Sequence, residues 1–313
     1  MSEFQIVHAD SEQALKTLPD GCVDVIITDP PYALVSGSYK GDGKHTGGFM
    51  GKKWDSQIPA LGLWQEVYRV LKPSGYAFVM SAPRADVYSR MILRLHDAGL
   101  DVDRSGLYWT FFSGFPKASN MGKMIDKRLG VKSIDLGQSP NWRESKRDRE
   151  KNGSMEVRGE NAGRITIATS PQAKVLDGSH AGYQPKPAWE AIIVAQKPPV
   201  TQEIFDTSAL SEQMQRVFPF MLVPKAAKKE KNAGCEEIGG CTHPTVKPMK
   251  LMSALVLIST GEGGFVLDPF VGSGTTVCSA VTNNRNAIGI DLDEGHVEIA
   301  NARARHWSTL DLD

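Results

Sequence analysis

The sequence predicts an α/β protein built around a mostly parallel β-sheet. Short apolar runs alternate with segments of helical spacing, which is the pattern of strand–helix–strand units. Four of these runs end at or shortly before an aspartate, namely Asp10, Asp29, Asp268 and Asp291. Because the carboxyl ends of parallel strands meet at one edge of a sheet, where α/β proteins bind their ligands, we expect the four acids to border one site. A chain of 313 residues with 41 % apolar content can bury one large core and a smaller appendage.

The predicted strands follow one another along the chain near residues 4–8, 23–28, 75–80, 264–268 and 286–290. A helix is predicted over 61–71, and the run Lys72-Pro73-Ser74-Gly75 is expected to end it before the third strand. The last helix, from Asp293 to Arg305, should lead into another parallel strand. The segment 5–7 can supply that strand, so the sheet is predicted to be circularly permuted, with the two ends of the chain close together on the surface.

The segment Asp29-Pro30-Pro31-Tyr32 combines groups that can activate a planar exocyclic amine. The lone pair of an aryl amine is delocalised into the ring, and two hydrogen-bond acceptors directed at its hydrogens would localise it. The carboxylate of Asp29 and the carbonyl of Pro30 can be these acceptors, because two prolines fix φ and hold the backbone extended. Tyr32 offers a face for stacking. The alternative is a strand that ends in a Pro-Pro turn with an incidental acid.

A second candidate site lies in the run 266–276, where a buried strand leads into a glycine turn and a helix. Gly272 and Gly274 permit close approach to the backbone, and Asp268 can meet a cationic or hydroxyl group. Asp291, at the end of the next strand, suits a carboxylate that holds a ribose diol. The third glycine of a dinucleotide fingerprint is missing, so a plain strand-to-helix turn or another nucleotide site is the alternative.

The order of these motifs resembles that of the β group of S-adenosylmethionine-dependent DNA amino-methyltransferases. The amine-activating segment comes first and the glycine turn last, with a long central region between them. The resemblance implies a Rossmann-like methyltransferase sheet, circularly permuted so that the catalytic motif precedes the cofactor motif, with an inserted target-recognition region. It also implies S-adenosylmethionine as the cofactor and double-stranded DNA as the substrate.

The same resemblance implies which residues hold the cofactor. The run 243–248 matches the family's segment that holds the methionine end, and Asp10 matches the acid that meets the adenine. Taken alone, the first can be a proline-rich helix start and the second an N-cap or turn. The implied cofactor-binding residues are Asp10, Thr245, Lys247, Pro248, Asp268, Phe270, Gly272, Ser273, Gly274, Thr275 and Asp291.

The implied activity is site-specific methylation of adenine N6, with the adenine rotated out of the duplex because its amine is inaccessible inside the stack. The catalytic residues would be Asp29, Pro30, Pro31 and Tyr32, acting by direct methyl transfer without a covalent enzyme intermediate. Adenine is favoured because the family usually pairs Asp at the first position with adenine and Ser with cytosine N4. Cytosine-N4 methylation is the alternative. A second alternative is a non-catalytic DNA-binding protein of the same fold, against which the intact catalytic residues argue. A third is a small-molecule methyltransferase, against which the basic middle region argues.

Charge is divided unevenly along the chain. The 36 basic and 36 acidic residues cancel, yet residues 113–250 hold 22 basic against 15 acidic residues. This excess coincides with the segment that the family uses for target recognition, so contact with phosphates is favoured over a merely solvated surface. The sequence is accordingly divided into a catalytic half of the core at 1–112, an inserted basic target-recognition region at 113–240 and a cofactor-binding half at 241–313. Within the insertion a strand over 188–194 is expected to return to the core, with Trp189 buried.

Candidates for contact with DNA are lysines of the runs 33–54 and 224–231, and Lys117. The glycine-rich run 33–54 follows Tyr32 and is interpreted as a lid over a displaced nucleotide, the alternative being a surface loop. The run 224–231 is a basic loop or short helix, suited equally to phosphate contact and to simple solvation. The candidate contacts are Lys40, Lys44, Lys52, Lys53, Lys117, Lys225, Lys228 and Lys229.

Composition argues against several other classes of protein. The chain has no run of about 18 uninterrupted apolar residues and no charged-then-apolar leader, so a cytoplasmic protein is expected rather than a membrane or secreted one. Four cysteines do not suggest a disulfide framework. Cys235, Cys241 and His243 could give three zinc ligands, but their spacing is not that of a standard knuckle and no fourth ligand is evident, so no metal is predicted. The resemblance is compatible with a cognate restriction nuclease that is not a stable subunit, and with a homodimer, for which no residue argues.

Overall fold

The computed structural model describes residues 2–32, 58–111, 117–138, 164–184, 188–199 and 206–309. It divides into two compact units, which we name the core unit (Met1–Ser113 with Ala188–Asp313) and the insert unit (Gly114–Pro187). The predicted insertion ran from 113 to 240, but residues after 187 belong with the core unit. The reason is that strands from 188 onward pair within the central sheet.

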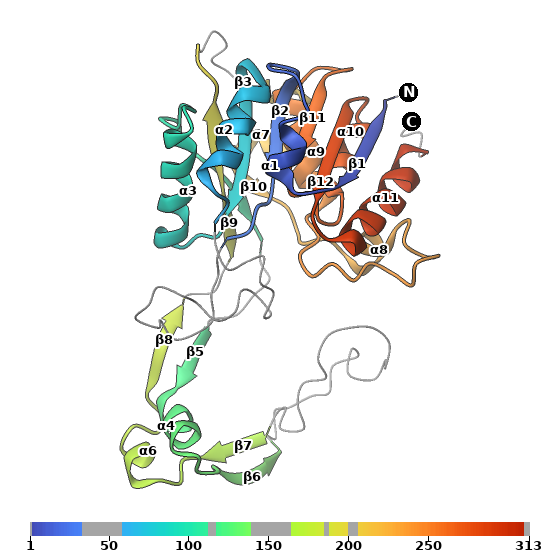
Figure 1. Cartoon of the computed structure of the whole chain (residues 1–313). Coiled ribbons are helices and arrows are strands. Elements are labelled where there is room, and N and C mark those ends of the chain that lie inside the picture. Colours follow the sequence, from blue (N-terminus) through green and yellow to red (C-terminus); the bar gives the residue numbers. More distant parts are fainter. Residues whose placement is uncertain are drawn as a thin grey trace. The chain divides into compact units, whose positions relative to one another are not determined.

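An eight-stranded sheet forms the centre of the core unit, in the order β1-β12-β11-β2-β3-β9-β4-β10 (Figure 1). Strand β9 runs antiparallel to both of its neighbours, and every other neighbouring pair is parallel. The predicted α/β fold with a mostly parallel sheet is confirmed. The strands are Phe4–His8 (β1), Val23–Thr28 (β2), Leu71–Ser81 (β3), Leu107–Thr110 (β4), Trp189–Gln196 (β9), Phe220–Leu222 (β10), Phe265–Asp268 (β11) and Asn286–Asp291 (β12).

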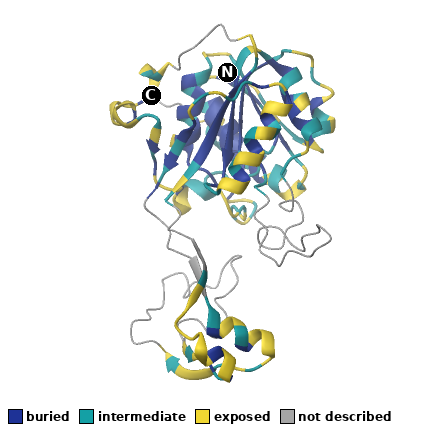
Figure 2. Ribbon diagram, turned by 90° about the vertical axis from the view of Figure 1, so that its left-hand side faces the viewer, coloured by how far each residue is buried: buried dark blue, intermediate teal, exposed yellow. Residues whose placement is uncertain are grey.

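Helices cover both faces of this sheet (Figure 1). The side chains of β2 alternate between two cores: Ile26 packs with the helices on one face, whereas Val25 and Ile27 pack with those on the other. Burial on both faces explains why the strand is mostly apolar, with Asp24 its one charged residue, and Figure 2 shows the buried residues concentrated along the strands. The first core contains residues of α1 (Ser11–Leu15), α2 (Leu61–Val70) and α3 (Ala85–Asp97), and the second contains residues of α7 (Glu212–Val217), α9 (Met249–Ser259), α10 (Thr275–Thr282) and α11 (Glu294–Ser308). A 3₁₀ turn, η3 (Thr207–Ala209), and α8 (Lys228–Asn232) complete the unit.

The N-terminal strand occupies the place that the permutation predicts. β1 pairs in parallel with β12, from Phe4 opposite Ala287 to His8 opposite Asp291. The two ends of the described chain meet the end of α10, because Ser2 Oγ donates to the Val281 carbonyl at 3.0 Å and Thr282 Oγ1 donates to the Trp307 carbonyl at 3.4 Å. The strand that should follow α11 is therefore supplied from the other end of the sequence.

Two local expectations are wrong. Strand β3 begins at Leu71, so the run 72–75 bends the strand instead of preceding it. Ser74 adopts a left-handed φ of 63°, and its amide donates to the Lys197 carbonyl at 2.9 Å. Trp189 was expected to be buried but is 40 % exposed, because it is the first residue of β9 and its ring meets only the edge of Tyr108 at 5.7 Å among the described ring contacts.

Where the structure describes it, the insert unit has two small antiparallel sheets and two helices around a buried carboxylate. Asp126 is fully buried and accepts hydrogen bonds from the amides of Thr169 at 2.8 Å and Ser170 at 3.0 Å and from the Ser170 hydroxyl at 2.7 Å. These bonds tie the two helices together. The elements are β5 (Lys117–Asn120) with β8 (His180–Gln184), β6 (Ile134–Gln138) with β7 (Arg164–Ile167), α4 (Met121–Leu129) and α6 (Pro171–Val175). In neither unit do the described residues include a helix long and apolar enough to cross a membrane.

Candidate active site

Three of the four predicted acids lie at the ends of adjacent parallel strands, and the fourth lies two residues past the end of another. Asp291 ends β12 and Asp268 ends β11, while Asp29 directly follows β2 and Asp10 comes shortly after β1. Since β1, β12, β11 and β2 are neighbours in the sheet, the acids border one edge of it. The amine-activating segment and the glycine turn are thereby brought together from opposite ends of the sequence.

Asp29 is held by a lysine and a tyrosine. Its Oδ2 lies 2.8 Å from Nζ of Lys247, and its Oδ1 accepts a hydrogen bond from the Tyr32 hydroxyl. Pro30 is buried, whereas Asp29, Pro31 and Tyr32 are partly exposed. The carboxylate is therefore fixed in orientation and still borders solvent.

Lys247 is placed differently from the cofactor role that the sequence implied. Its ammonium bridges two carboxylates, Asp29 at 2.8 Å and Glu190 at 3.1 Å, and its side chain is only 10 % exposed. Burial by itself lowers the pKa of Lys247, but the attraction of the two carboxylates outweighs burial and raises this pKa above its ordinary value. Lys247 is thus a charged partner of Asp29.

Glu190 was not identified from the sequence. It lies on β9 opposite Trp109 of β4, and directly opposite residues of an antiparallel pair share one face of the sheet. The only signal in the sequence was the strand predicted over 188–194, which contains Glu190. Its pairing with Lys247 depends on the folded arrangement.

The glycine turn between β11 and α10 is tightly fixed. Gly272 and Gly274 adopt left-handed φ values of 48° and 78°, which favour glycine. A Cβ on Gly274 would lie 2.8 Å from the Ala300 Cα, so the turn packs directly on α11. From the same helix the buried Arg303 donates through Nη1 to the Ser273 carbonyl at 2.5 Å and to Oγ1 of Thr275 at 3.0 Å.

Asp291 is joined to this turn. Its Oδ2 accepts from the amide of Gly272 at 2.9 Å, and its Oδ1 accepts from the amide of Asp293 at 2.9 Å and lies 3.3 Å from His296 Nδ1. Burial opposes the charge, but the hydrogen bonds from His296 and the two amides outweigh it and lower the pKa of Asp291. The carboxylate is therefore ionised beside the turn.

Asp268 links the two motifs. Its Oδ1 accepts hydrogen bonds from Oγ1 of Thr28 at 2.7 Å and from the amide of Phe270 at 3.0 Å. Thr28 is the residue before Asp29, so these bonds fix the end of β2 to the start of the glycine turn. Because the carboxyl group is buried, desolvation raises the pKa of Asp268 to about 6.

The remaining predicted cofactor residues have mixed surroundings. Asp10 is exposed and caps α1, accepting from the amide of Gln13 at 3.0 Å, so its N-cap alternative is realised. Pro248 is buried and is the N-cap residue of α9, whereas Thr245 is exposed. Nearby, burial lowers the pKa of His243 to about 3, so this imidazole is neutral and stacks edge-on with His296 at 4.6 Å.

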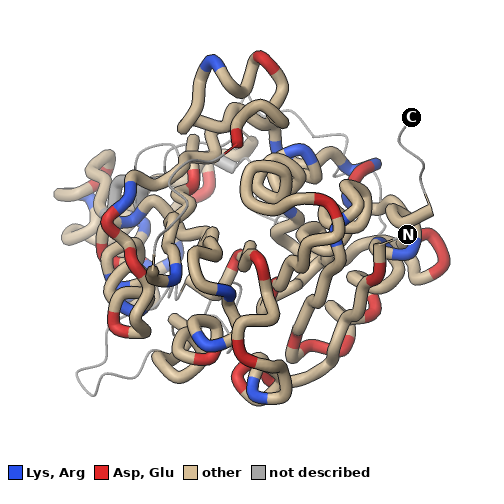
Figure 3. The backbone as a smooth tube through the Cα atoms, turned by 90° about the horizontal axis from the view of Figure 1, so that it is seen from above, with Lys and Arg blue, Asp and Glu red and all other residues tan. Residues whose placement is uncertain are grey.

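Only part of the predicted DNA surface falls within the described residues. Lys225 is exposed, with its ammonium 4.3 Å from the centre of the Phe111 ring, and Lys228 and Lys229 are exposed on α8. The predicted lid at 33–54, with Lys40, Lys44, Lys52 and Lys53, lies outside the described residues, as does the side chain of Lys117. Figure 3 shows Lys and Arg interspersed with Asp and Glu along the backbone.

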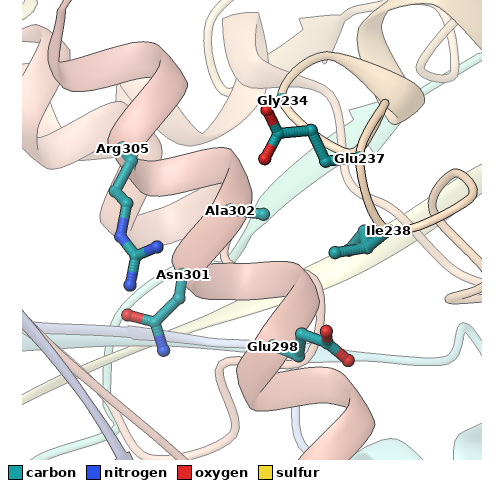
Figure 4. A pocket seen from close by; sticks show the side chains of 7 residues that line it. All are labelled: Gly234, Glu237, Ile238, Glu298, Asn301, Ala302 and Arg305. Atoms are coloured by element: carbon teal, nitrogen blue, oxygen red, sulfur yellow. The ribbon is translucent and has the colours of Figure 1, made fainter.

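A groove of about 400 Å³ lies elsewhere, between the segment around Gly234 and α11 (Figure 4). It contains none of the predicted site residues. Its lining is Gly234, Glu237, Ile238, Glu298, Asn301, Ala302 and Arg305. Among the described residues no group of three or more His, Cys, Asp or Glu side chains could hold a metal ion.

Curated DNA methyltransferases resemble this chain over most of its length. The chain is 27 % identical over 303 residues to the type II methyltransferase M.HpaI of Haemophilus parainfluenzae. The matched region covers 96 % of this chain and 73 % of that protein. It is 24 % identical over 318 residues to the DNA adenine methyltransferase YhdJ of Escherichia coli (strain K12), covering 98 % and 85 %.

Solved structures share the fold at low sequence identity. The cytosine-N4-specific PvuII DNA methyltransferase superposes with a TM-score of 0.60 at 17 % identity, covering 100 % of this chain and 88 % of that one. M1.HpyAVI in its SAM complex gives a TM-score of 0.51 at 19 % identity, covering 96 % and 99 %. The family model described as DNA methylase matches residues 23–302, and the chain therefore belongs to the family of DNA methylases that modify adenine N6 or cytosine N4.

Proposed function

We propose that this protein transfers a methyl group from S-adenosylmethionine to N6 of an adenine in DNA. The observation that carries the proposal is the position of Asp29, whose carboxylate is fixed by Lys247 and Tyr32 at the sheet edge that also carries the glycine turn. Amine methylation requires a hydrogen-bond acceptor for the amine next to the site of the methyl donor, and Asp29 and the glycine turn can supply these two parts. Membership of the DNA methylase family makes DNA the substrate.

The chain's residues fit the cofactor. A Cβ on Gly272 would lie 2.9 Å from Nε2 of His243, so glycine is needed for the imidazole of the 243–248 segment to lie directly against the turn. The ionised Asp291 suits ribose hydroxyls. The exposed Asp10, two residues past the end of the neighbouring strand β1, suits the amine of an adenine ring. S-adenosylmethionine supplies an electrophilic methyl group on a sulfonium. The residues that would hold it are the turn Gly272–Thr275 together with Asp10, Phe270, Thr245 and Asp291.

The residues of the Asp-Pro-Pro-Tyr segment then act on the target base. Tyr32 stacks on the base after it leaves the duplex, and Asp29 and the Pro30 carbonyl accept hydrogen bonds from its amine. These bonds localise the nitrogen lone pair and stabilise the positive charge that develops on nitrogen as it attacks. Catalysis comes from positioning and electrostatics, without an enzyme nucleophile.

Adenine is proposed over cytosine because Asp, and not Ser, stands at the first position of the segment. Known relatives do not separate the two, since YhdJ is named an adenine methyltransferase and the PvuII enzyme is cytosine-N4-specific. Cytosine N4 is therefore the second candidate. M.HpaI is named a type II methyltransferase, and a nuclease acting on the same DNA site is the partner that the sequence resemblance allows.

The test is to incubate the protein with methyl-labelled S-adenosylmethionine and unmethylated genomic DNAs of differing base composition. The DNA is then digested, and the modified nucleoside is identified by mass. We expect N6-methyldeoxyadenosine. N4-methyldeoxycytidine would replace the first candidate by the second, and absence of label in DNA would reject both.

The variant Asp29→Ala should retain binding of S-adenosylmethionine and lose at least about 100-fold in methyl transfer, as expected when a preorganised catalytic contact is removed. Asp97→Ala, an exposed acid on α3, is the matched control and should behave as the wild type. An Asp29→Ala variant with full activity would refute the role given to this residue.

A further inference from the structure

We propose that Lys247 and Glu190 are positioning residues that orient Asp29 and set the net charge of the amine site. This inference rests on the proposed function and deepens it. We name the three residues the Asp29 cluster. Lys247 was implied to hold the cofactor, and Glu190 had no assigned role.

The geometry of the Asp29 cluster is that of a bridged carboxylate pair. Nζ of Lys247 lies 2.8 Å from Oδ2 of Asp29 and 3.1 Å from Oε2 of Glu190, with side chains exposed by 10 %, 20 % and 18 % respectively. A lysine shared by two carboxylates in a nearly dry site is held much more firmly than a surface ion pair. The three groups come from separate elements: the end of β2, strand β9 and the segment before α9.

Surrounding groups keep the lysine in place. Its ammonium lies 5.6 Å from the ring centre of Trp109 and 5.9 Å from that of Tyr32, within the range of cation–π attraction. The indole of Trp109 is itself fixed, because its Nε1 donates to the Val223 carbonyl at 2.7 Å. Pro248 follows Lys247 and restricts its backbone. The ammonium therefore has little freedom to turn toward another ligand.

Lys247 determines which oxygen of Asp29 can receive the target amine. The ammonium holds Oδ2, and Oδ1 accepts from the Tyr32 hydroxyl, so Oδ1 lies on the side of the carboxylate that faces Tyr32. A base stacked on that ring would present its amine to Oδ1. The lysine thus fixes the carboxylate in the rotation that the reaction needs.

Glu190 determines the charge that the amine meets. Asp29 and Lys247 alone would sum to zero, whereas the Asp29 cluster of two carboxylates and one ammonium carries −1. The amine becomes positively charged as it attacks, and a net negative charge in a site of low dielectric stabilises that charge. Glu190 acts through Lys247 and need not touch the base.

The experiment compares Glu190→Gln, Lys247→Met, Lys247→Arg and the double variant Glu190→Gln/Lys247→Met. The matched control is Lys250→Met, an exposed lysine three residues further on. For each, the single-turnover methylation rate at saturating DNA and cofactor is measured separately from the dissociation constants of both. Thermal melting followed by circular dichroism reports folding.

We expect Glu190→Gln to slow methyl transfer by about 10- to 100-fold, with both dissociation constants within about threefold of wild type, because a transition-state charge is affected and ground-state binding is not. Lys247→Met should lose at least as much, and Lys247→Arg should recover part of the loss because guanidinium can also bridge two carboxylates. The double variant should be no slower than the worse single variant, as expected of residues that act as a unit.

Three results would overturn the proposal: an unchanged rate in Glu190→Gln, losses that multiply in the double variant, or a loss in Lys247→Met that lies mainly in cofactor affinity. The last would return Lys247 to the cofactor site. If Lys247→Met does not fold, Glu190→Gln and Lys247→Arg still decide. A wild-type protein that methylates no DNA refutes the proposed function, whereas an active wild type with unaffected variants refutes only the role of the Asp29 cluster.

Discussion

The hydroxyl of Tyr32 contacts the oxygen of Asp29 that the target amine would use. In the structure Tyr32 donates to Oδ1 of Asp29 while Lys247 holds Oδ2. A base entering the site must therefore displace the hydroxyl while keeping the tyrosine ring for stacking. Under the proposed function, the ring and the hydroxyl of this side chain should have opposite effects on substrate binding.

We therefore expect Tyr32→Phe and Tyr32→Ala to differ in sign. Removing only the hydroxyl removes a competing hydrogen bond of about 1 kcal/mol, so Tyr32→Phe should lower the KM for DNA by about fivefold with kcat largely retained. Removing the ring as well loses about 1–3 kcal/mol of stacking, so Tyr32→Ala should raise KM by about 5- to 150-fold. Steady-state kinetics on DNA measures both. If Tyr32→Phe is as inactive as Tyr32→Ala, the hydroxyl itself takes part in the chemistry.

Single residues were predictable where their role follows from the strand that carries them. Asp29 and Asp291 were found because each closes an apolar strand, and the sheet brings both to its carboxyl edge. Glu190 could not be found, because its significance depends on a lysine that is distant in sequence. For the same reason the sequence did not indicate that the side chain of Lys247 pairs with Asp29 and Glu190.

At the scale of elements, one carboxylate holds the insert unit together. Hydrogen bonds from Ser170 and Thr169 lower the pKa of Asp126 below its ordinary value. In the unfolded chain this pKa returns to normal, so the folded form binds a proton less readily. The stability that Asp126 provides is therefore complete above the ordinary pKa of an aspartate and is lost as the pH falls toward the lower, folded value.

Asp126→Asn should accordingly destabilise the insert unit at neutral pH and weaken its acid sensitivity. The variant replaces one of the two acceptor oxygens by an NH2 donor that faces the amide of Thr169 or Ser170, and the melting temperature of the unit should fall by several degrees. Hydrogen exchange of the amides in α4, followed by mass spectrometry of the whole protein between neutral and mildly acidic pH, measures both effects. Asp135→Asn is the control, because Asp135 is exposed and an amide oxygen can still accept from Gly137. Equal exchange in Asp126→Asn and wild type at neutral pH would contradict the structural role.

Elements were predictable where burial on both faces leaves a mostly apolar run, as in β2 and β11. The run 72–75 was predicted to precede the third strand because proline and glycine usually end an element, but it lies within β3. In the folded chain Gly75 lets β3 pair closely with β2, because a Cβ at this position would lie 2.9 Å from the Asp24 carbonyl on that neighbouring strand. Close backbone approach, and not a turn, is the reason for that glycine. The three-residue strand β10 is too short to have a periodic signal.

In the whole molecule, the excess of basic residues is confined to the insert unit and does not extend over the whole insertion predicted from the sequence. The insert unit, 114–187, holds 14 basic and 8 acidic residues. Residues 188–240, which the sequence reading had added to the insertion, hold 6 basic and 7 acidic residues. Counting charges alone could not place the boundary, because adding the nearly neutral residues 188–240 to the basic residues 114–187 leaves the net charge positive. The pairing of β9 and β10 in the central sheet places it.

This concentration of charge leads to an expectation about DNA affinity. If the insert unit contacts phosphates, its exposed lysines Lys123, Lys127 and Lys174 should contribute to the salt dependence of binding. Each phosphate contact adds about 0.9 to the slope of log K against log salt concentration, so the triple Lys→Gln variant should lower the slope by up to about 3. The single-turnover methylation rate at saturating DNA should stay the same, because these residues belong to a unit separate from the Asp29 cluster.

The matched control changes three exposed basic residues of the core unit, Lys16, Arg90 and Lys250, to Gln. Both triple variants lose the same total charge, so a general effect of charge would lower the slope equally in the two. A fall confined to the insert-unit variant would locate phosphate contact in that unit. An equal fall would mean that only the net charge matters, and unchanged slopes in both would leave the basic excess of the insert unit without a role in DNA binding. Comparing location at constant charge therefore separates a docking surface from a merely solvated one.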